Sequence, residues 1–251
     1  MNCLQQMMSC LSYTLEQLGL YEPQINVQEA RDRLRIESKL WKKCQGDRSD
    51  LWNNFQGSSR TDGQLPSLVE KAITHLGSKD IKRGIAVDLG CGINTTVFNL
   101  LERGWKVYAV DSSDAVIKTL TEKVSSMGKS WIQDGQLVLI HQSIEEFEFP
   151  EKVHLVTATD SLPYCNPKKI NNVLFGIKAA LLPQGVLACN VFPYNDNPMA
   201  DNMLRGMFGA WMITKNVVEA VMQSVDFTTW SVTEGMSPGG MAKQFHIIAQ
   251  A

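Results

Sequence analysis

Apolar residues in this chain form short continuous runs that alternate with longer stretches in which they recur every three or four positions. Such runs are typical of buried strands, and such stretches are typical of amphipathic helices. The runs that have the length of strands are 85–87, 106–110, 136–141, 153–158, 186–192, 227–232 and 244–249. Helices are expected at 65–76, directly after the small-residue turn at 90–94, and at 112–126, 166–182 and 213–224. This alternation predicts an α/β fold with a doubly wound, mostly parallel seven-stranded sheet, and the glycine- and proline-rich turn before residue 244 predicts an antiparallel hairpin at its end.

The first 45 residues differ in character from the rest. Their apolar residues fall on one stripe of a helix: Leu4, Met7, Met8, Leu11, Leu15 and Leu18. Gly19 and Pro23 interrupt the pattern, which resumes from Val27 to Trp41 among many charges. We therefore divide the chain into an N-terminal helical extension (1–45) and a second domain (46–251). The extension is expected to pack on that domain; a lid, a contact between two copies of the chain and an adaptable binding face are the alternatives that its methionines leave open.

The stretch from Ile85 to Ser113 carries the strongest functional signal. A strand ends at Asp88, a glycine turn and a helix follow, and a second strand ends at Asp111. Glycines let the turn take positive φ and approach a ligand closely, and the helix after it presents free N–H groups. Asp111 lies 111 − 92 = 19 residues after Gly92, close to the ~20 expected of a carboxylate that binds the hydroxyls of a ribose. The stretch predicts a nucleoside site.

The residues of the turn indicate which nucleoside binds. A dinucleotide site needs a third glycine, and Thr95 stands in its place. The string VDLGCG at 87–92 instead resembles motif I of the class I S-adenosylmethionine-dependent methyltransferases. Asn94 departs from the small residue usual in the family, but asparagine tolerates the left-handed backbone that such a turn needs. The resemblance implies a Rossmann-like methyltransferase fold, S-adenosylmethionine as cofactor and S-adenosylhomocysteine as product.

The resemblance also assigns roles around the turn. Asp88 would help to hold the amino group of the cofactor's methionine part. Gly90, Cys91 and Gly92 would make room for the cofactor, and Asp111 would bind the ribose.

Three further residues are expected near the adenosine. Ser112 directly follows Asp111 at the end of its strand. After the third strand the family often has an acid and then an apolar residue beside the adenine; here Ser143 takes the place of the acid, and Ile144 is expected to pack on the ring. An ordinary helix cap at Ser143 is the alternative.

The polar segment 45–63 carries two aromatic residues, Trp52 and Phe55. In many small-molecule methyltransferases a segment at this position folds over the cofactor. We therefore assign Trp52 and Arg60 to the cofactor site, with Phe55 beside them. Anchoring of the segment to the core by the two aromatic residues is the alternative.

Residues 159–164 follow the fourth strand, where a ligand at the carboxyl ends of the strands would lie. The string SLPY at 161–164 resembles the (N/D/S)PP(Y/F) motif of amino methyltransferases, although Leu162 replaces the first proline. A proline-containing turn is the alternative. We take Asp160 and Tyr164 as the candidate catalytic groups, able to remove a proton from an amine or hydroxyl, and place Thr159 in the cofactor site.

Composition narrows the classes of function. The net charge of −2 and the pI near 6.1 give no general attraction to phosphates and disfavour a nucleic-acid partner. The six cysteines and four histidines show no metal-ligand spacing, so no metal is expected. The chain shows no signal peptide and no apolar run near the ~20 residues of a membrane span, which predicts a cytoplasmic protein with reduced thiols and no membrane partner.

From about Asp50 to Ala251 the chain is most similar to the small-molecule branch that contains the tellurite-resistance and thiopurine methyltransferases. We therefore predict an enzyme that transfers a methyl group from S-adenosylmethionine to a small-molecule acceptor by in-line displacement. Two alternatives stay open: the same chemistry on a protein or nucleic acid, and a non-catalytic nucleoside-binding or interaction module. A homo-oligomer formed through residues 1–45 also stays open.

Overall fold

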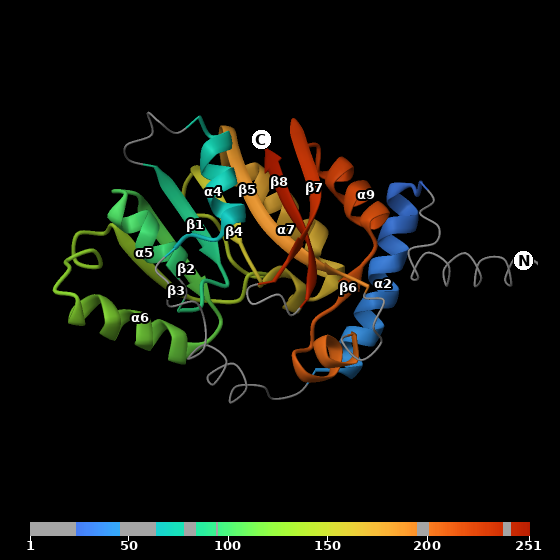
Figure 1. Cartoon of the computed structure of the whole chain (residues 1–251), viewed down its shortest axis with the longest axis horizontal. Coiled ribbons are helices and arrows are strands. Elements are labelled where there is room, and N and C mark those ends of the chain that lie inside the picture. Colours follow the sequence, from blue (N-terminus) through green and yellow to red (C-terminus); the bar gives the residue numbers. More distant parts are fainter. Residues whose placement is uncertain (1–23, 46–63, 78–83, 94, 195–200, 238–241) are drawn as a thin grey trace, which may run out of the picture.

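The computed structural model describes residues 24–45, 64–77, 84–93, 95–194, 201–237 and 242–251. An open, twisted β-sheet runs through the molecule, and helices cover both of its faces (Figure 1). The predicted stripe at residues 4–18 and the predicted cofactor segment with Trp52, Phe55 and Arg60 lie outside the described residues.

The strands of the sheet follow the order β3-β2-β1-β4-β5-β8-β7. They are β1 (Ile85–Leu89), β2 (Lys106–Asp111), β3 (Leu137–His141), β4 (Val153–Ala158), β5 (Leu181–Pro193), β7 (Thr229–Met236) and β8 (Lys243–Gln250). A short strand, β6 (Met212–Ile213), pairs with the end of β5 outside this path. The strands β1 to β5 are parallel, whereas β8 runs antiparallel to both β5 and β7. The predicted mostly parallel seven-stranded sheet with a C-terminal hairpin is confirmed.

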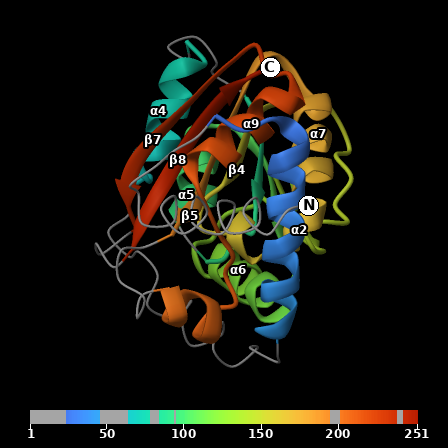
Figure 2. The ribbon, with the colours of Figure 1, turned by 90° about the vertical axis from the view of Figure 1, so that its right-hand side faces the viewer.

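The helices form two layers, one on each face of the sheet. One layer contains α4 (Ser67–His75), α5 (Thr95–Glu102) and α6 (Asp114–Ser126). The other contains α7 (Ile170–Ala180), α9 (Lys215–Val225) and α2 (Val27–Lys43), which lies along α9 in both views (Figures 1 and 2). Because helices cover both faces, the central strands are apolar on both faces and build one hydrophobic core with each layer.

Local sequence explains how several of these helices begin. The Ser113 side chain accepts a hydrogen bond from the Val116 N–H at the start of α6, and Asn26 caps α2 in the same way. The buried residues of α6 are Val116, Leu120 and Val124, four positions apart, so they form one stripe against the sheet.

The structure corrects some of the predicted boundaries around β5. The helix expected at 166–182 begins as a separate 3₁₀ turn, η2 (Pro167–Lys169), and α7 ends at Ala180. Residues 183–185, which the predicted elements leave as a connection between the helix and the next strand, lie inside β5, where Gln184 has φ 66° and the pairing with β4 shifts register. A residue in the left-handed region lets the strand bulge and continue, which the sequence pattern alone does not distinguish from a turn.

The C-terminal hairpin differs in its limits. Strand β7 starts two residues later than expected and runs to Met236, into the segment predicted as a turn. In the part of the chain that the structure describes, no helix combines the length and the apolar character needed to span a membrane.

The strand order reverses between β1 and β4, because β2 and β3 lie to one side of β1 and β5 lies beyond β4. In open parallel sheets, ligands bind outside the carboxyl ends of the strands at such a switch point. The fold therefore brings the ends of β1, β2 and β4 together as the candidate site.

Candidate cofactor and active site

The glycine turn after β1 folds back over the end of β2. The N–H groups of Gly90 and Cys91 donate to the Val110 carbonyl, with N···O distances of 2.8 and 3.0 Å. Gly90 has φ +69°, and a Cβ built there would lie 2.5 Å from the Cβ of Ser161, so only glycine fits. Gly92 has φ +52°, and a Cβ there would meet no atom within 4 Å. The first glycine is required by packing, whereas the second faces open space that a ligand can approach.

Asp111 ends β2 and turns its carboxylate toward the glycine turn. Its Oδ2 accepts a hydrogen bond from the Gly92 N–H at 2.9 Å, and its Oδ1 accepts one from the Ser113 N–H at 2.9 Å. Burial raises the pKa of this carboxyl, while the N–H groups of Ser113 and Gly92 oppose the rise. Each oxygen still has a lone pair for a further donor, so the carboxylate can bind hydroxyl groups at the turn without moving.

Asp88 is the last residue but one of β1 and is 1% exposed. Thr157 on β4 donates its hydroxyl to Asp88 Oδ1 at 2.6 Å, whereas Oδ2 is buried without a hydrogen-bond partner among the described residues. Burial raises the pKa of Asp88 to about 7; the Thr157 bond opposes this and the charge of Asp111 adds to it. Because buried acceptors are almost always bonded in native proteins, Asp88 Oδ2 fits a site for a donor from a ligand, such as an ammonium group.

Two serine hydroxyls beside the turn share this property. Ser143 Oγ, after β3, and Ser161 Oγ, after β4, are buried without a partner in the described part of the chain. Ile144 lies close by, since its Cδ1 would be 3.4 Å from a Cβ at Gly90. Unpaired polar oxygens at the ends of β1, β3 and β4 thus surround the glycine turn, and together with the open space at Gly92 they fit a nucleoside with a charged amino acid tail.

The remaining predicted cofactor residues are placed differently. The Cys91 side chain is fully buried beneath the turn, and burial raises the pKa of its thiol, so only its backbone can reach a ligand. Ser112 is exposed at the end of β2, and its carbonyl accepts a hydrogen bond from His141 Nε2 at 3.0 Å. Thr159 is half-buried directly after β4.

Asp160 adopts a strained conformation directly beyond β4. Its φ of 55° lies in the left-handed region, which costs a non-glycine residue about 1–3 kcal/mol. The buried amide of Asn190 holds it from two sides: the Asp160 N–H donates to Asn190 Oδ1 at 2.7 Å, and Asn190 Nδ2 donates to Asp160 Oδ1 at 2.8 Å. Gln244 Nε2, from β8, donates to the same carboxylate oxygen.

Tyr164 ends the 3₁₀ turn η1 (Leu162–Tyr164), so the SLPY segment is a proline-containing turn as the alternative reading expected. Its ring packs edge-to-face on Phe192, with centroids 6.3 Å apart. Burial and the charge of Asp160 raise the pKa of the Tyr164 hydroxyl far above its ordinary value. A phenol of this kind stays protonated at neutral pH, so Tyr164 can donate a hydrogen bond there, whereas Asp160 is the better proton acceptor of the two candidates.

The sequence analysis missed three residues of this region: Thr157, Asn190 and Gln244. Asn190 interrupts the apolar run of β5, and a single amide within a buried strand must find partners. That signal was present in the sequence, but it does not identify the partner. Thr157 and Gln244 carry no such signal, because threonine is common in strands and glutamine is common on exposed ones.

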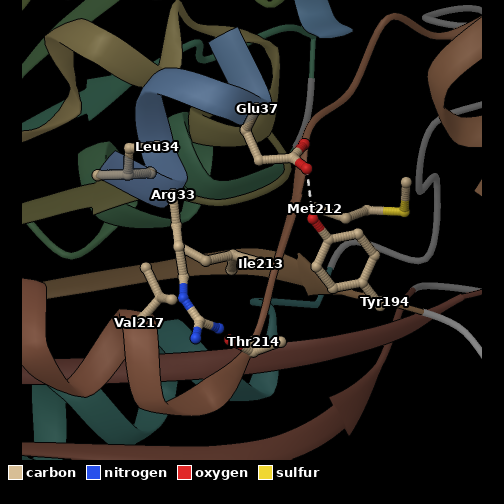
Figure 3. A pocket seen from close by; sticks show the side chains of 8 residues that line it. All are labelled: Arg33, Leu34, Glu37, Tyr194, Met212, Ile213, Thr214 and Val217. Carbon is tan, nitrogen blue, oxygen red and sulfur yellow. Dashed lines mark hydrogen bonds between the residues drawn. The ribbon is translucent and has the colours of Figure 1, made fainter. Parts of the chain in front are cut away.

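Helix α2 packs on α9 and on η2, and its polar side chains bond to segments beyond the strands. Its Glu37 is 3% exposed and pairs with Arg205, with N···O distances of 2.7 and 3.1 Å. Figure 3 shows Glu37 and Tyr194 pointing toward each other above a small pocket between α2, the end of β5 and the start of α9, and the Tyr194 hydroxyl donates to Glu37 Oε1. Ser38 donates to Asn166 Oδ1 at 2.9 Å. Helix α2 is thus bonded to the segments that follow both β4 and β5.

Comparison with known proteins agrees with this geometry. Residues 86–185 match the sequence family described as a methyltransferase domain. No curated protein matches the chain significantly in sequence.

Solved structures share the fold at low sequence identity. A SAM-dependent methyltransferase from Methanosarcina mazei has 16% identity and a TM-score of 0.58, over 74% of this chain and 98% of that one. Magnesium protoporphyrin IX methyltransferase from Synechocystis PCC 6803, with bound SAH, has 14% identity and a TM-score of 0.56, over 84% and 93%. The 1,6-didemethyltoxoflavin-N1-methyltransferase of Burkholderia thailandensis, with bound S-adenosylhomocysteine, has 17% identity and a TM-score of 0.53, over 73% and 76%.

The matched segment spans the glycine turn, Asp88, Asp111 and the end of β4, which are the parts that build the candidate site. The cofactor implied by the sequence also fits the unpaired oxygen of Asp88 and the open space at Gly92. Residues 86–185 therefore carry a methyltransferase domain, and the chain has the fold of S-adenosylmethionine-dependent methyltransferases.

Proposed function

We propose that this enzyme methylates a small molecule, which binds beyond the ends of β4 and β5. One observation carries the proposal: an apolar and aromatic cluster formed by the chain itself lies on that side of the site. Its buried members are Phe192, Leu204, Ala210, Met212 and Ala242, and Tyr164, Tyr194 and Phe208 pack against them. A cap of this composition fits an acceptor with a small apolar body, whereas a macromolecule would need an open surface.

The charges on this side support the same conclusion. Arg205, which follows Leu204 of this cluster, is held by Glu37 in a largely buried ion pair. The chain as a whole carries a net charge of −2, so it offers no general attraction to nucleic-acid phosphates. Two of the structures with this fold are named for small acceptors, 1,6-didemethyltoxoflavin and magnesium protoporphyrin IX.

The described residues would divide the work as follows. Asp88, oriented by Thr157, would hold the amino group of the cofactor, and Asp111 would hold its ribose. The cofactor supplies a methyl group on a positively charged sulfur, which is already activated for in-line displacement. The protein then contributes mainly by orienting the reactants at near-attack distance, which removes much of the entropic barrier. Asp160 would accept a proton where the acceptor must lose one.

A transfer screen with methyl-labelled S-adenosylmethionine tests the proposal. The panel should contain small amines, phenols, nitrogen heterocycles, thiols and carboxylic acids, with a bulk protein extract and a mixed RNA sample as macromolecular arms. We expect label in one or more small molecules only. Label confined to protein or RNA would contradict the small-molecule assignment.

Cofactor binding is measured in parallel. Calorimetry with S-adenosylhomocysteine should show at least a tenfold loss of affinity in Asp111→Ala, because hydrogen bonds from ribose hydroxyls to a carboxylate contribute about 1.5–3 kcal/mol each. Glu122→Ala, which removes an exposed carboxylate on α6, is the control. Equal affinities of the two variants would refute the ribose role of Asp111.

A further inference from the structure

The two oxygens of the Asp160 carboxylate have different surroundings. Oδ1 accepts two hydrogen bonds from side-chain amides, one from Asn190 and one from Gln244. No described residue donates to Oδ2. Since Oδ2 is not one of the buried side-chain atoms without a partner, it is accessible from outside the protein. One oxygen is therefore fixed by the protein, while the other remains available to a ligand.

The two amides come from strands that flank each other. Asn190 on β5 is 1% exposed and Gln244 on β8 is 3% exposed. Asn190 pairs with His246 in the sheet register, so the three polar side chains lie near one another at this end of the sheet. Burying two amides is costly unless they are bonded, and both donate to the same carboxylate.

The hydrogen bonds extend from Asp160 to His246. A carboxylate oxygen only accepts, so the Gln244 amide must turn its NH₂ group toward Asp160 and its oxygen toward His246. His246 Nε2 lies 3.2 Å from Gln244 Oε1, which means that this ring nitrogen carries a proton and donates it. Burial and Lys71 on α4 lower the pKa of His246, and Asp160 opposes them, so the chain of donors is neutral at neutral pH.

Gly235 on β7 provides the space for this arrangement. It pairs with Gln244, and a Cβ built on it would lie 2.3 Å from the Cε1 atom of His246. A glycine in a strand often marks a place where another group approaches the backbone closely. The imidazole is thus held against the backbone of β7 beside Gln244.

A salt bridge would have anchored Asp160 more simply, but it would also have compensated its charge. Among the described residues, Asn190 from β5 and Gln244 from β8 bond to Asp160, and Tyr164 from η1 lies close enough to feel its charge; none of the three is a cation. Neutral donors orient the carboxylate and leave its negative charge uncompensated. Such a carboxylate attracts an N–H or O–H group and repels an anion.

We propose that Asn190, Gln244 and His246 are positioning residues that hold Asp160 with Oδ2 open to the acceptor, and that the acceptor atom is a nitrogen or oxygen that carries a hydrogen. This inference rests on the proposed function, since it names the acceptor class of the same site. As the nitrogen or oxygen forms its bond to the methyl carbon, the carbon–sulfur bond breaks with its electron pair on sulfur. The proton of the acceptor passes to Asp160 Oδ2, which leaves a neutral carboxylic acid and a neutral thioether.

The test compares acceptors that carry different atoms on the same aromatic ring, and it compares two protein variants with substitutions in β8. The probes are phenol, aniline, thiophenol and benzoic acid, together with any acceptor found in the labelled-cofactor screen. Gln244→Leu removes the donor to Asp160. Gln250→Leu is the matched control, because Gln250 lies on the same strand and its amide donates to the Gln184 carbonyl at 3.2 Å, far from Asp160.

We expect methyl transfer to nitrogen or oxygen acceptors, with kcat at least tenfold lower in Gln244→Leu and unchanged in Gln250→Leu. The KM for S-adenosylmethionine and the affinity for S-adenosylhomocysteine should stay within about twofold, because Gln244 acts on the acceptor side only. A thiol acceptor reacts as its thiolate and needs no base, so its turnover should not respond to Gln244→Leu. His246→Gln, which keeps a donor, should retain more activity than His246→Phe.

A measurement without any acceptor tests the positioning role. Solvent exchange of the Asn190 side-chain amide protons, followed by NMR, should accelerate in Gln244→Leu and not in Gln250→Leu, because Asp160 is then held by one amide only.

The outcomes separate the two proposals. Turnover of thiols or carboxylic acids alone, or an unchanged kcat in Gln244→Leu, or unchanged exchange at Asn190, would overturn the positioning inference and leave the small-molecule function standing. Transfer to no small molecule at all would overturn both.

Discussion

Binding of the cofactor should depend on pH through Asp88. This carboxyl is buried, its Oδ2 has no partner among the described residues, and its pKa is raised to about 7, mainly by burial. A positively charged amino group prefers the ionised form, so binding must release a proton wherever Asp88 is protonated in the free enzyme. Affinity should therefore fall as the pH is lowered through 7.

The pKa sets the size of the effect. If only the ionised form binds, the apparent dissociation constant scales as one plus the ratio of protonated to ionised Asp88. With a pKa of about 7, that factor changes roughly 25-fold between pH 7.5 and 5.5, or about 2 kcal/mol. The range stops near pH 7.5 so that an α-amino group, with an ordinary pKa of about 7.7–8.0, keeps its charge.

Calorimetry with S-adenosylhomocysteine in buffers of different ionisation enthalpy measures both the affinity and the protons released. Asp88→Asn is the control, since an amide cannot titrate; its affinity should be low and nearly independent of pH. The Asp111 carboxyl, whose pKa is also raised, remains in that variant, so any slope that persists belongs to it. An affinity of the wild-type enzyme that is equal at pH 5.5 and 7.5 would refute the reasoning.

The same carboxyl predicts how the ligand-free protein responds to pH. The pKa of Asp88 is higher in the folded state than its ordinary value of 3.8, so the folded protein binds this proton more tightly than the unfolded chain does. Its contribution to stability is thus fully present below pH 4 and is lost as the pH rises to 7, by about 4 kcal/mol at most. Chemical denaturation of wild type and Asp88→Asn at pH 4.5 and at pH 7.5 measures this contribution, as the difference between their free energies of unfolding.

Two further predictions concern contacts that hold this region together. Glu37→Ala leaves Arg205 without its buried partner and should lower the free energy of unfolding by about 3 kcal/mol in urea denaturation, since Arg205 is 17% exposed and can partly relax. Replacing both residues by methionine should recover most of the loss. A loss below about 1 kcal/mol in Glu37→Ala would contradict the role of the pair. Gly90→Ala places a Cβ at φ +69° and 2.5 Å from the Cβ of Ser161, so it should destabilise the protein by about 2–4 kcal/mol. Adding Ser161→Gly should relieve the clash but not the backbone strain. If the double variant is no more stable to thermal denaturation than Gly90→Ala, the clash is not the cause.

The arrangement of the glycine turn and Asp111 could be predicted from sequence because its geometry is encoded locally. A strand, a glycine turn, a helix and a second strand fix the path of 29 consecutive residues from Ile85 to Ser113. The offset between Gly92 and Asp111 becomes a direct hydrogen bond in the structure, because the two parallel strands are neighbours and end at the same edge.

The acceptor side could not be predicted in the same way, because its contacts join distant parts of the chain. Asp160 meets Asn190 across 30 positions and Gln244 across 84. These pairings depend on the register of β8 against β5, and a register shift of one residue would turn Gln244 to the other face. Sequence patterns fix the faces of a strand but not the register between two strands that lie 50 or more residues apart.

The sequence of α2 contains one further signal of a long-range contact, which is the position of Glu37. Ala30, Leu34 and Glu37 lie four and three positions apart, so they fall on one stripe, and the structure buries all three. A carboxylate on the apolar stripe of a helix requires a buried cation or donor, and the structure supplies Arg205 at a separation of 168 positions. Since removal of either partner leaves a buried charge, the energies of α2 and of the segment around Arg205 are coupled. If that segment covers the acceptor, as we propose, a change in α2 that alters the position of Glu37 acts on acceptor binding, although no residue of α2 need touch the acceptor.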